Sequence, residues 1–124
     1  MTRMMIVDAS EESRLLMKDF LLAYNHNVIA EASDGIEAIE KYNSEKPDLI
    51  FLDLAMPKLD GLSVLRKIRF NDHTSKIIVI IGNDDINFFE ECIRLGVLAF
   101  LTKPFDLNDV LSAISFSNEM TVVK

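Results

Sequence analysis

The sequence has a single cysteine and lacks any apolar stretch long enough to cross a membrane. Cys92 alone excludes an internal disulfide, and one lone thiol is typical of proteins from a reducing compartment. A membrane helix needs about 20 apolar residues, and no run in this chain approaches that length. The first apolar run, Met4 to Val7, is too short for the core of a signal peptide. We therefore expect a cytoplasmic protein without a membrane partner.

Basic residues and glycines are also scarce. The 13 lysines and arginines are outnumbered by 20 acids, which gives a net charge of −7. Because nucleic acids are bound by clustered basic side chains, we expect no nucleic-acid partner. Only four glycines occur, and neither GxGxxG nor GxxxxGKS/T is present. The commonest dinucleotide-binding and phosphate-cradling loops are thereby excluded.

The sequence does contain a regular alternation of short apolar runs and longer amphipathic segments. Between the runs, apolar residues recur at intervals of three and four, the spacing of a helix with one buried face. Continuous apolar runs are typical of parallel strands that are covered on both faces. The runs are Met4–Val7, Val28–Ala30, Leu49–Leu52, Ile77–Ile81 and Leu98–Leu101. Five such units in 124 residues predict one α/β domain built as a three-layer sandwich.

Three charged residues stand at the ends of predicted strands. Asp8 and Asp53 directly follow the first and third runs, and Lys103 comes just after the fifth. Open parallel sheets bind ligands at the carboxyl ends of their strands, so these side chains are expected to meet. Each residue alone is an ordinary loop charge, but their convergence favours a site. Two carboxylates and an ammonium at one edge indicate metal-assisted phosphoryl chemistry on an aspartate.

Several short motifs occur in a fixed order along the chain. They are Ile6-Val7-Asp8, Ala32-Ser33-Asp34-Gly35, Pro47-Asp48-Leu49-Ile50-Phe51-Leu52-Asp53, Met56-Pro57-Lys58-Leu59-Asp60-Gly61 and Leu101-Thr102-Lys103-Pro104-Phe105. Together they resemble the motifs of a two-component response-regulator receiver domain. The resemblance covers roughly residues 3 to 117, and the tail from 118 to 124 has no clear pattern. It implies a flavodoxin-like fold with parallel strands in the order 2-1-3-4-5.

The resemblance implies a role for each residue of the predicted site. In the receiver family, an aspartate at the end of the third strand accepts a phosphoryl group from a histidine kinase, and that aspartate is Asp53 here. Lys103 would stabilise the phosphoryl oxygens. Asp8, Asp53 and the backbone carbonyl of Ala55 would bind Mg²⁺. The bond between Lys103 and Pro104 resembles the family's cis peptide.

The resemblance also implies a signalling module, not an enzyme, with at most self-phosphorylation and self-dephosphorylation of its aspartate. A chain of 124 residues has no room for a receiver and an effector domain. We therefore expect one receiver over residues 1–124, with output through a downstream protein partner. Its partners would be a histidine kinase or phosphotransfer protein and that downstream protein, and the chain would be a monomer or weak dimer.

Two positions depart from the family pattern. The second acid that usually follows the first-strand aspartate is Ala9 here, so we expect weak Mg²⁺ binding. Counting back from Lys103 places the family's switch serine or threonine at Ile81, which cannot hydrogen-bond a phosphoryl oxygen. A register slip of two residues would instead offer the amide of Asn83, although the apolar run fits a strand through Ile81. Phe100 stands at the family's switch aromatic, and an ordinary strand-end hydrophobe is an equally good interpretation.

These departures leave alternatives open. The chain could be a degenerate receiver that acts as an interaction module without phosphorylation. A more remote alternative is an aspartyl-phosphate hydrolase. It is disfavoured because Asp53-Leu54-Ala55 lacks the second acid that such enzymes carry two residues after the nucleophile.

Overall fold

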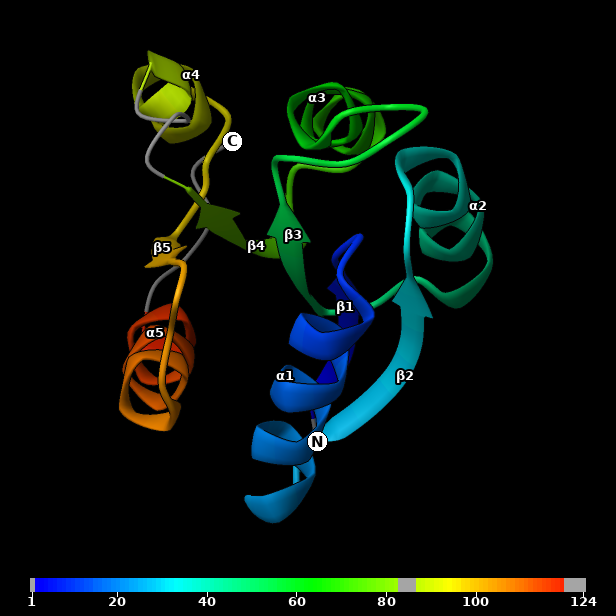
Figure 1. Ribbon diagram of the computed structural model, residues 1–124. Helices are drawn as coiled ribbons and strands as arrows, with labels where there is room; N and C mark the ends of the chain where they lie inside the picture. The colour runs from blue at the N-terminus through cyan, green and yellow to red at the C-terminus, as the bar shows by residue number, and fades with distance from the viewer. Residues whose placement is uncertain (1, 83–86, 120–124) are drawn as a thin grey trace.

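The computed structural model describes residues 2–82 and 87–119, which include a five-stranded parallel sheet (Figure 1). The strand order is β2-β1-β3-β4-β5, which confirms the flavodoxin-like fold expected from the sequence. The strands are β1 (Arg3–Val7), β2 (Asn27–Ala32), β3 (Leu49–Asp53), β4 (Lys76–Ile81) and β5 (Ala99–Thr102).

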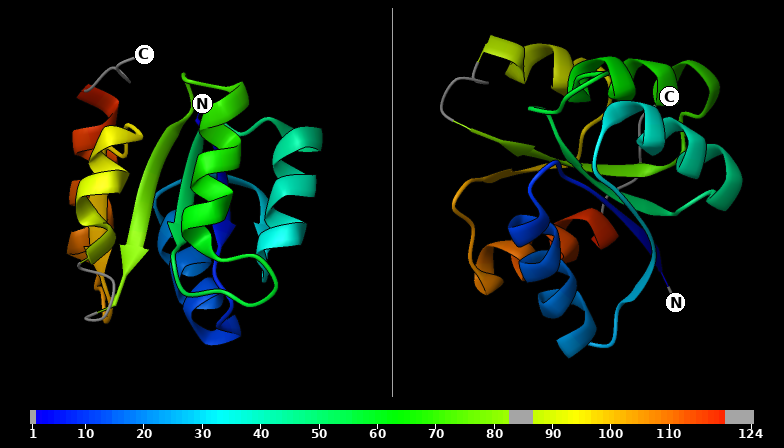
Figure 2. Two further views of the ribbon diagram at one scale, coloured as in Figure 1. Left: turned by 90° about the horizontal axis from the view of Figure 1, so that it is seen from above. Right: turned by 45° about the vertical axis from the view of Figure 1, so that its right-hand side comes forward.

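Helices cover both faces of this sheet. Figures 1 and 2 show α2, α3 and α4 on one face and α1 and α5 on the other, so the molecule has three layers. Within the described residues, none of these helices is both long and apolar enough to cross a membrane. They are α1 (Glu11–Ala23), α2 (Gly35–Glu45), α3 (Gly61–Asn71), α4 (Phe89–Arg94) and α5 (Leu107–Glu119).

The central strands are buried on both faces, as their uninterrupted apolar sequences require. Successive side chains of a strand point to opposite faces, so β3 contributes to two separate cores. Ile50 and Leu52 pack in the cluster beneath α2, α3 and α4. Leu49 and Phe51 pack in the cluster with α1 and α5. The alternation fixes the register of β3 and thereby the position of its last residue, Asp53.

The predicted boundaries differ from the observed ones by at most two residues. Strand β2 runs from Asn27 to Ala32 and so extends the predicted apolar run in both directions. Leu98 precedes β5, although its N–H still donates to the carbonyl of Ile77 at 3.0 Å. The last helix continues through Glu119, two residues into the tail that lacked a sequence pattern.

Candidate functional site

Strand pairing brings the predicted site residues to one edge of the sheet. Val7 is aligned with Leu52, so Asp8 and Asp53 follow two neighbouring strands at the same level. The backbone N–H of Lys103 donates to the carbonyl of Ile81 at 3.0 Å, which holds Lys103 at the end of the β4–β5 pair. The sequence prediction that these three charges meet is thus confirmed by the geometry.

Both carboxylates are buried and are oriented by backbone amides. Asp8 is only 1% exposed and its Oδ1 accepts a hydrogen bond from the N–H of Ser10 at 2.9 Å. Asp53 is 4% exposed and its Oδ1 accepts from the N–H of Ala55 at 3.1 Å. These bonds use one oxygen of each group and leave the Oδ2 atoms for a cation.

Lys103 bridges the two carboxylates. Its Nζ lies 3.0 Å from Oδ2 of Asp53 and 3.1 and 3.0 Å from Oδ1 and Oδ2 of Asp8. The peptide bond between Lys103 and Pro104 is cis, as the resemblance predicted. A single ammonium therefore faces two carboxylates, and the site keeps an excess negative charge that can attract a further cation.

The protonation of Asp53 reflects this crowding. Burial, and then the nearby negative charge of Asp8, raises the pKa of Asp53 to about 6, against the opposing effect of Lys103. Burial lowers the pKa of Lys103, but the two carboxylates outweigh burial and raise it. At neutral pH the ammonium is charged and Asp53 is mostly ionised, which a nucleophilic carboxylate requires.

Asp8 carries the clearest sign of a cation site. Its buried Oδ2 accepts no hydrogen bond, although it lies beside the ammonium of Lys103. Carboxylate oxygens are ligands that Mg²⁺ prefers, so Asp8 and Asp53 fit such an ion. In the described part of the chain, however, no group of three or more His, Cys, Asp or Glu side chains could hold a metal. The donor set therefore fits Mg²⁺ but supplies few charged ligands.

The family model for the response regulator receiver domain matches residues 4–115. The chain belongs to this family. It is 35% identical over 113 residues to the chemotaxis protein CheY of Bacillus subtilis, a match that covers 91% of this chain and 94% of the relative. The sporulation initiation phosphotransferase F of the same species is 26% identical, and the match covers 90% of both chains.

Solved structures agree with this assignment. The REC domain of AraT from Geobacillus stearothermophilus matches with a TM-score of 0.85 and 30% identity, covering 95% of this chain and 94% of that one. A chain of the CheX–CheY–BeF₃–Mg²⁺ complex from Borrelia burgdorferi matches with a TM-score of 0.86 and 30% identity, covering 91% and 86%. The chain is therefore a signalling receiver of the type found in two-component and phosphorelay systems.

The two departures of this receiver lie beside the site. Ala9 is exposed and adds no side-chain oxygen. Ile81 is the last residue of β4, is half-buried and packs against the core under α2, α3 and α4. Because Asp53 pairs with Ile80 and Lys103 donates to the carbonyl of Ile81, the end of β4 adjoins Asp53. The alternative donor, Asn83, lies outside the described residues.

Phe100 is neither exposed nor isolated. Its ring stacks on that of Phe89, the first residue of α4, with centroids 4.0 Å apart and planes inclined by 21°. It also packs against the core, so it joins β5 to α4. Both sequence interpretations of Phe100 are compatible with this contact, and its switch role remains a prediction.

Three arginines near the site or its neighbouring helices were missed by sequence reasoning. Arg14 Nη1 donates to the carbonyl of Asp8 at 2.7 Å, and a basic residue early in the helix after Asp8 was the available signal. Arg66 makes two bonds to Glu91, of 2.5 and 2.8 Å. Buried Arg69 donates to the carbonyl of Leu95 at 2.6 Å. The contacts of Arg66 and Arg69 hold α4 against α3. No pattern in the sequence predicts them.

Proposed function

We propose that this receiver accepts a phosphoryl group on Asp53 from a histidine kinase or a phosphotransfer protein. The observation that carries the proposal is the bridge from Lys103 to Asp53 and Asp8. In the transfer, a carboxylate oxygen of Asp53 bonds to phosphorus while the bond from phosphorus to the donor's histidine nitrogen breaks. The nitrogen keeps the electron pair of that bond. Lys103 lies where it can neutralise charge on the transferred oxygens.

Mg²⁺ would be held by Asp8 and Asp53, with the backbone carbonyl of Ala55 as a third protein ligand. When bound, the ion neutralises part of the charge that develops on the phosphoryl oxygens. The ammonium of Lys103 contacts the same two carboxylates, so it competes with the ion for their oxygens. Because Ala9 adds no carboxylate, we expect weaker Mg²⁺ binding than in a receiver with a complete acid pair.

The remaining features of the proposal concern the molecule as a whole. Residues 1–124 act as one receiver in the cytoplasm, as a monomer or weak dimer and without nucleic-acid binding. The site performs no catalysis beyond self-phosphorylation and self-dephosphorylation. Output passes to a downstream protein. A chain similar to this one occurs in the complex of CheX with CheY, BeF₃ and Mg²⁺ from Borrelia burgdorferi, which agrees with a receiver that binds a second protein.

The proposal is tested by incubating the protein with acetyl phosphate and saturating Mg²⁺, followed by intact-mass measurement. We expect an increase of one phosphoryl mass, which EDTA prevents, and peptide mapping should place it on the segment containing Asp53. An unlabelled protein under saturating Mg²⁺ would contradict the proposal. That result would favour the phosphorylation-independent interaction module instead.

The substitution Ala9→Asp is expected to tighten Mg²⁺ binding at least tenfold. It places a second hard oxygen donor beside Asp8 and Asp53, and divalent affinity follows the number of charged ligands. The added negative charge should lower stability without metal, and Mg²⁺ should restore it by mass action. Isothermal titration with MgCl₂ measures the affinity, and thermal melts with and without Mg²⁺ measure the stability.

Ala9→Asn is the matched control for this substitution. Asparagine has nearly the same size as aspartate but no charge, so we expect its Mg²⁺ affinity to stay within threefold of the wild type. An unchanged Mg²⁺ titration in Ala9→Asp would show that residue 9 does not face the ion.

Phosphorylation of this receiver is expected to change the affinity of its output partner by less than tenfold, or about 1.4 kcal/mol. Ile81 has no hydroxyl with which to bind a phosphoryl oxygen, so the phosphorylated state gains no contact at the end of β4.

Ile81→Thr should bind beryllofluoride, a mimic of the phosphoryl group, about tenfold more tightly in the presence of Mg²⁺. Competition by beryllofluoride against acetyl phosphate labelling measures this affinity.

Ile81→Val controls for the change in size, because valine and threonine have the same shape and differ by one hydroxyl. Its affinity for beryllofluoride should equal that of the wild type. Equal affinities in the Thr and Val variants would show that residue 81 does not reach the phosphoryl group.

A further inference from the structure

A groove of about 460 Å³ lies between α2 and α3, on a face of the protein that phosphoryl transfer does not use. Its floor is apolar, with Tyr42 and Ile68 both buried. Ile39 of α2 lines one side and Phe70 of α3 lines the other. The volume lies within the range of about 300–1,000 Å³ that is typical of ligand-binding clefts.

Phe70 is the most unusual residue of this groove. Its side chain is 85% exposed, more than any other exposed large hydrophobic residue in the described part of the chain. On the facing helix, Ile36 and Ile39 are three residues apart and thus share one side of α2. Ile36 is also exposed. Exposed apolar side chains in and near a groove are typical of an interaction site.

The charged side chains that line the groove are all basic. They are Arg66 and Lys67, and the other two polar lining side chains besides Tyr42 are asparagines. This is unusual in a protein with a net charge of −7. Two acids bond to lining residues from outside the groove, Asp72 to Tyr42 and Glu91 to Arg66. Arg66 is engaged by Glu91, whereas Lys67 makes no ion pair within residues 2–82 and 87–119. The groove therefore presents an unneutralised cation beside an apolar floor.

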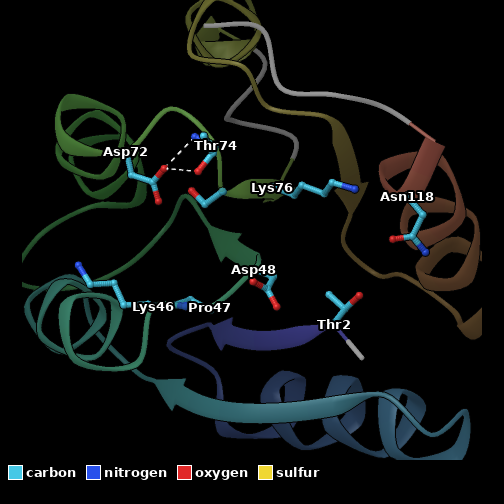
Figure 3. A pocket seen from close by; sticks show the side chains of 9 residues that line it. Thr2, Lys46, Pro47, Asp48, Asp72, Thr74, Lys76 and Asn118 are labelled. Carbon is cyan, nitrogen blue, oxygen red and sulfur yellow. Dashed lines mark hydrogen bonds between the residues drawn. The ribbon is translucent and has the colours of Figure 1, made fainter.

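A second hollow lies at the opposite end of the sheet from Asp53 (Figure 3). Unlike the α2–α3 groove, it is polar and is lined by charges of both signs. It has a volume of about 590 Å³ and mixes Lys46 and Lys76 with Asp48 and Asp72. Its carboxylates already have partners: Asp48 accepts from the N–H of Arg3 at 2.9 Å, and Asp72 accepts from Thr74. Its two lysines and two aspartates balance in charge, so the hollow does not select a ligand by the sign of its charge.

The α2–α3 groove is also firmly built. The Tyr42 hydroxyl donates to Asp72, which fixes the ring that forms the floor. Gly35, at the start of α2, hydrogen-bonds through its N–H to the carbonyl of Pro57, in the loop that leads into α3. The two helices lie side by side in the views of Figure 2. A groove with fixed walls loses little conformational entropy when a partner binds.

We propose that the α2–α3 groove docks an acidic amphipathic helix of a partner protein. Apolar side chains at helical spacing would cover Ile39, Tyr42 and Phe70, and carboxylates beside them would pair with Lys67 and the rim at Arg66. A second copy of this chain fits less well, because a symmetric dimer would set Lys67 and Arg66 of one copy against the same basic groove of the other. The surface is separate from the Asp53 site and goes beyond phosphoryl signalling.

The test uses two synthetic helical peptides as probes of this groove. Both carry leucines at helical spacing on one face, and they differ only in having glutamates or lysines at the flanking positions. The ¹⁵N-labelled protein is titrated with each peptide and followed by amide chemical shifts. We expect the glutamate peptide to shift residues 39–43 and 66–71, with an affinity at least fivefold higher than that of the lysine peptide. Shifts confined to another face, or equal affinities, would overturn the proposal.

Surface variants make the test specific, because exposed positions can be changed without unfolding the protein. Phe70→Ser should weaken the glutamate peptide at least tenfold, and Lys67→Glu at least threefold. Phe116→Ser is the matched control: this aromatic is 48% exposed on α5, and its loss should leave the affinity unchanged. Unchanged binding to Phe70→Ser would overturn the proposal.

Two further outcomes separate this proposal from its alternatives. Asp53→Asn should bind the glutamate peptide with the same affinity as the wild type. The docking proposal can therefore hold even if the phosphoryl-transfer proposal fails. Sedimentation of the protein without peptide should show a monomer. A dimer that Phe70→Ser dissociates would make a second copy the occupant and overturn the partner-helix assignment.

Discussion

Asp53→Asn is expected to abolish phosphoryl incorporation from acetyl phosphate completely. An amide lacks the anionic oxygen that attacks phosphorus, and among the described residues no other group at this edge has a comparable position. Asp8 is the nearest carboxylate, but its Oδ1 is held by the N–H of Ser10 and both of its oxygens contact Lys103. The fold should persist, because asparagine matches aspartate in shape and removes a charge whose burial is costly. Intact-mass measurement and a thermal melt on the same sample check both points.

Asp60→Asn is the matched control. Asp60 caps the N-terminus of α3, where its side chain accepts from the N–H of Ser63 at 2.9 Å, and asparagine caps helices equally well. This variant should be labelled like the wild type. Persistent labelling of Asp53→Asn, with the adduct mapped to the segment containing Asp8, would transfer the acceptor role to Asp8.

The positions of the strands and of the three charges were predictable because short-range rules decide them. An apolar run such as Leu49–Leu52 can be satisfied only when both faces of its strand are covered, and parallel strands then place their carboxyl ends at one edge. Asp8 and Asp53 therefore had to meet once their strands were adjacent. The order of the strands came from the resemblance, since periodicity alone does not choose neighbours.

Contacts between distant side chains were not predictable in the same way. All three charges were expected to meet, but the direct contacts of Lys103 with both carboxylates depend on how the loop after β5 is placed. Arg66 and Glu91 are 25 residues apart on different helices, and their charges are ordinary for solvated helix faces. The α2–α3 groove could not be predicted either, because the sequence does not distinguish an exposed Phe70 from a buried one.

Gly61→Ala is expected to destabilise the protein by about 3 kcal/mol, the upper part of the usual range for overpacking, and to lower the melting temperature by about 10 °C. Gly61 begins α3 directly against the end of β3. A Cβ there would overlap the carbonyl oxygen of Asp53 and the Cα of Leu54, closer than real Cβ contacts occur, and would lie 2.9 Å from the carbonyl carbon of Asp53. All of these atoms belong to the backbone, so no rotamer change relieves the overlap. The higher helix propensity of alanine offsets only about 1 kcal/mol of this loss of stability.

Gly35→Ala is the control that separates the effect of lost stability from the effect of a displaced Asp53 backbone. Gly35 also begins a helix, and a Cβ there would overlap the carbonyl oxygen of Leu59 and lie 2.6 Å from the Cβ and carbonyl carbon of that residue. Both variants should melt at lower temperature, but only Gly61→Ala pushes on the backbone of Asp53. At a temperature where both remain folded, acetyl phosphate labelling should slow at least tenfold in Gly61→Ala and much less in Gly35→Ala. Equal labelling rates in the two variants would show that the packing of α3 against the end of β3 does not set the position of the Asp53 carboxylate.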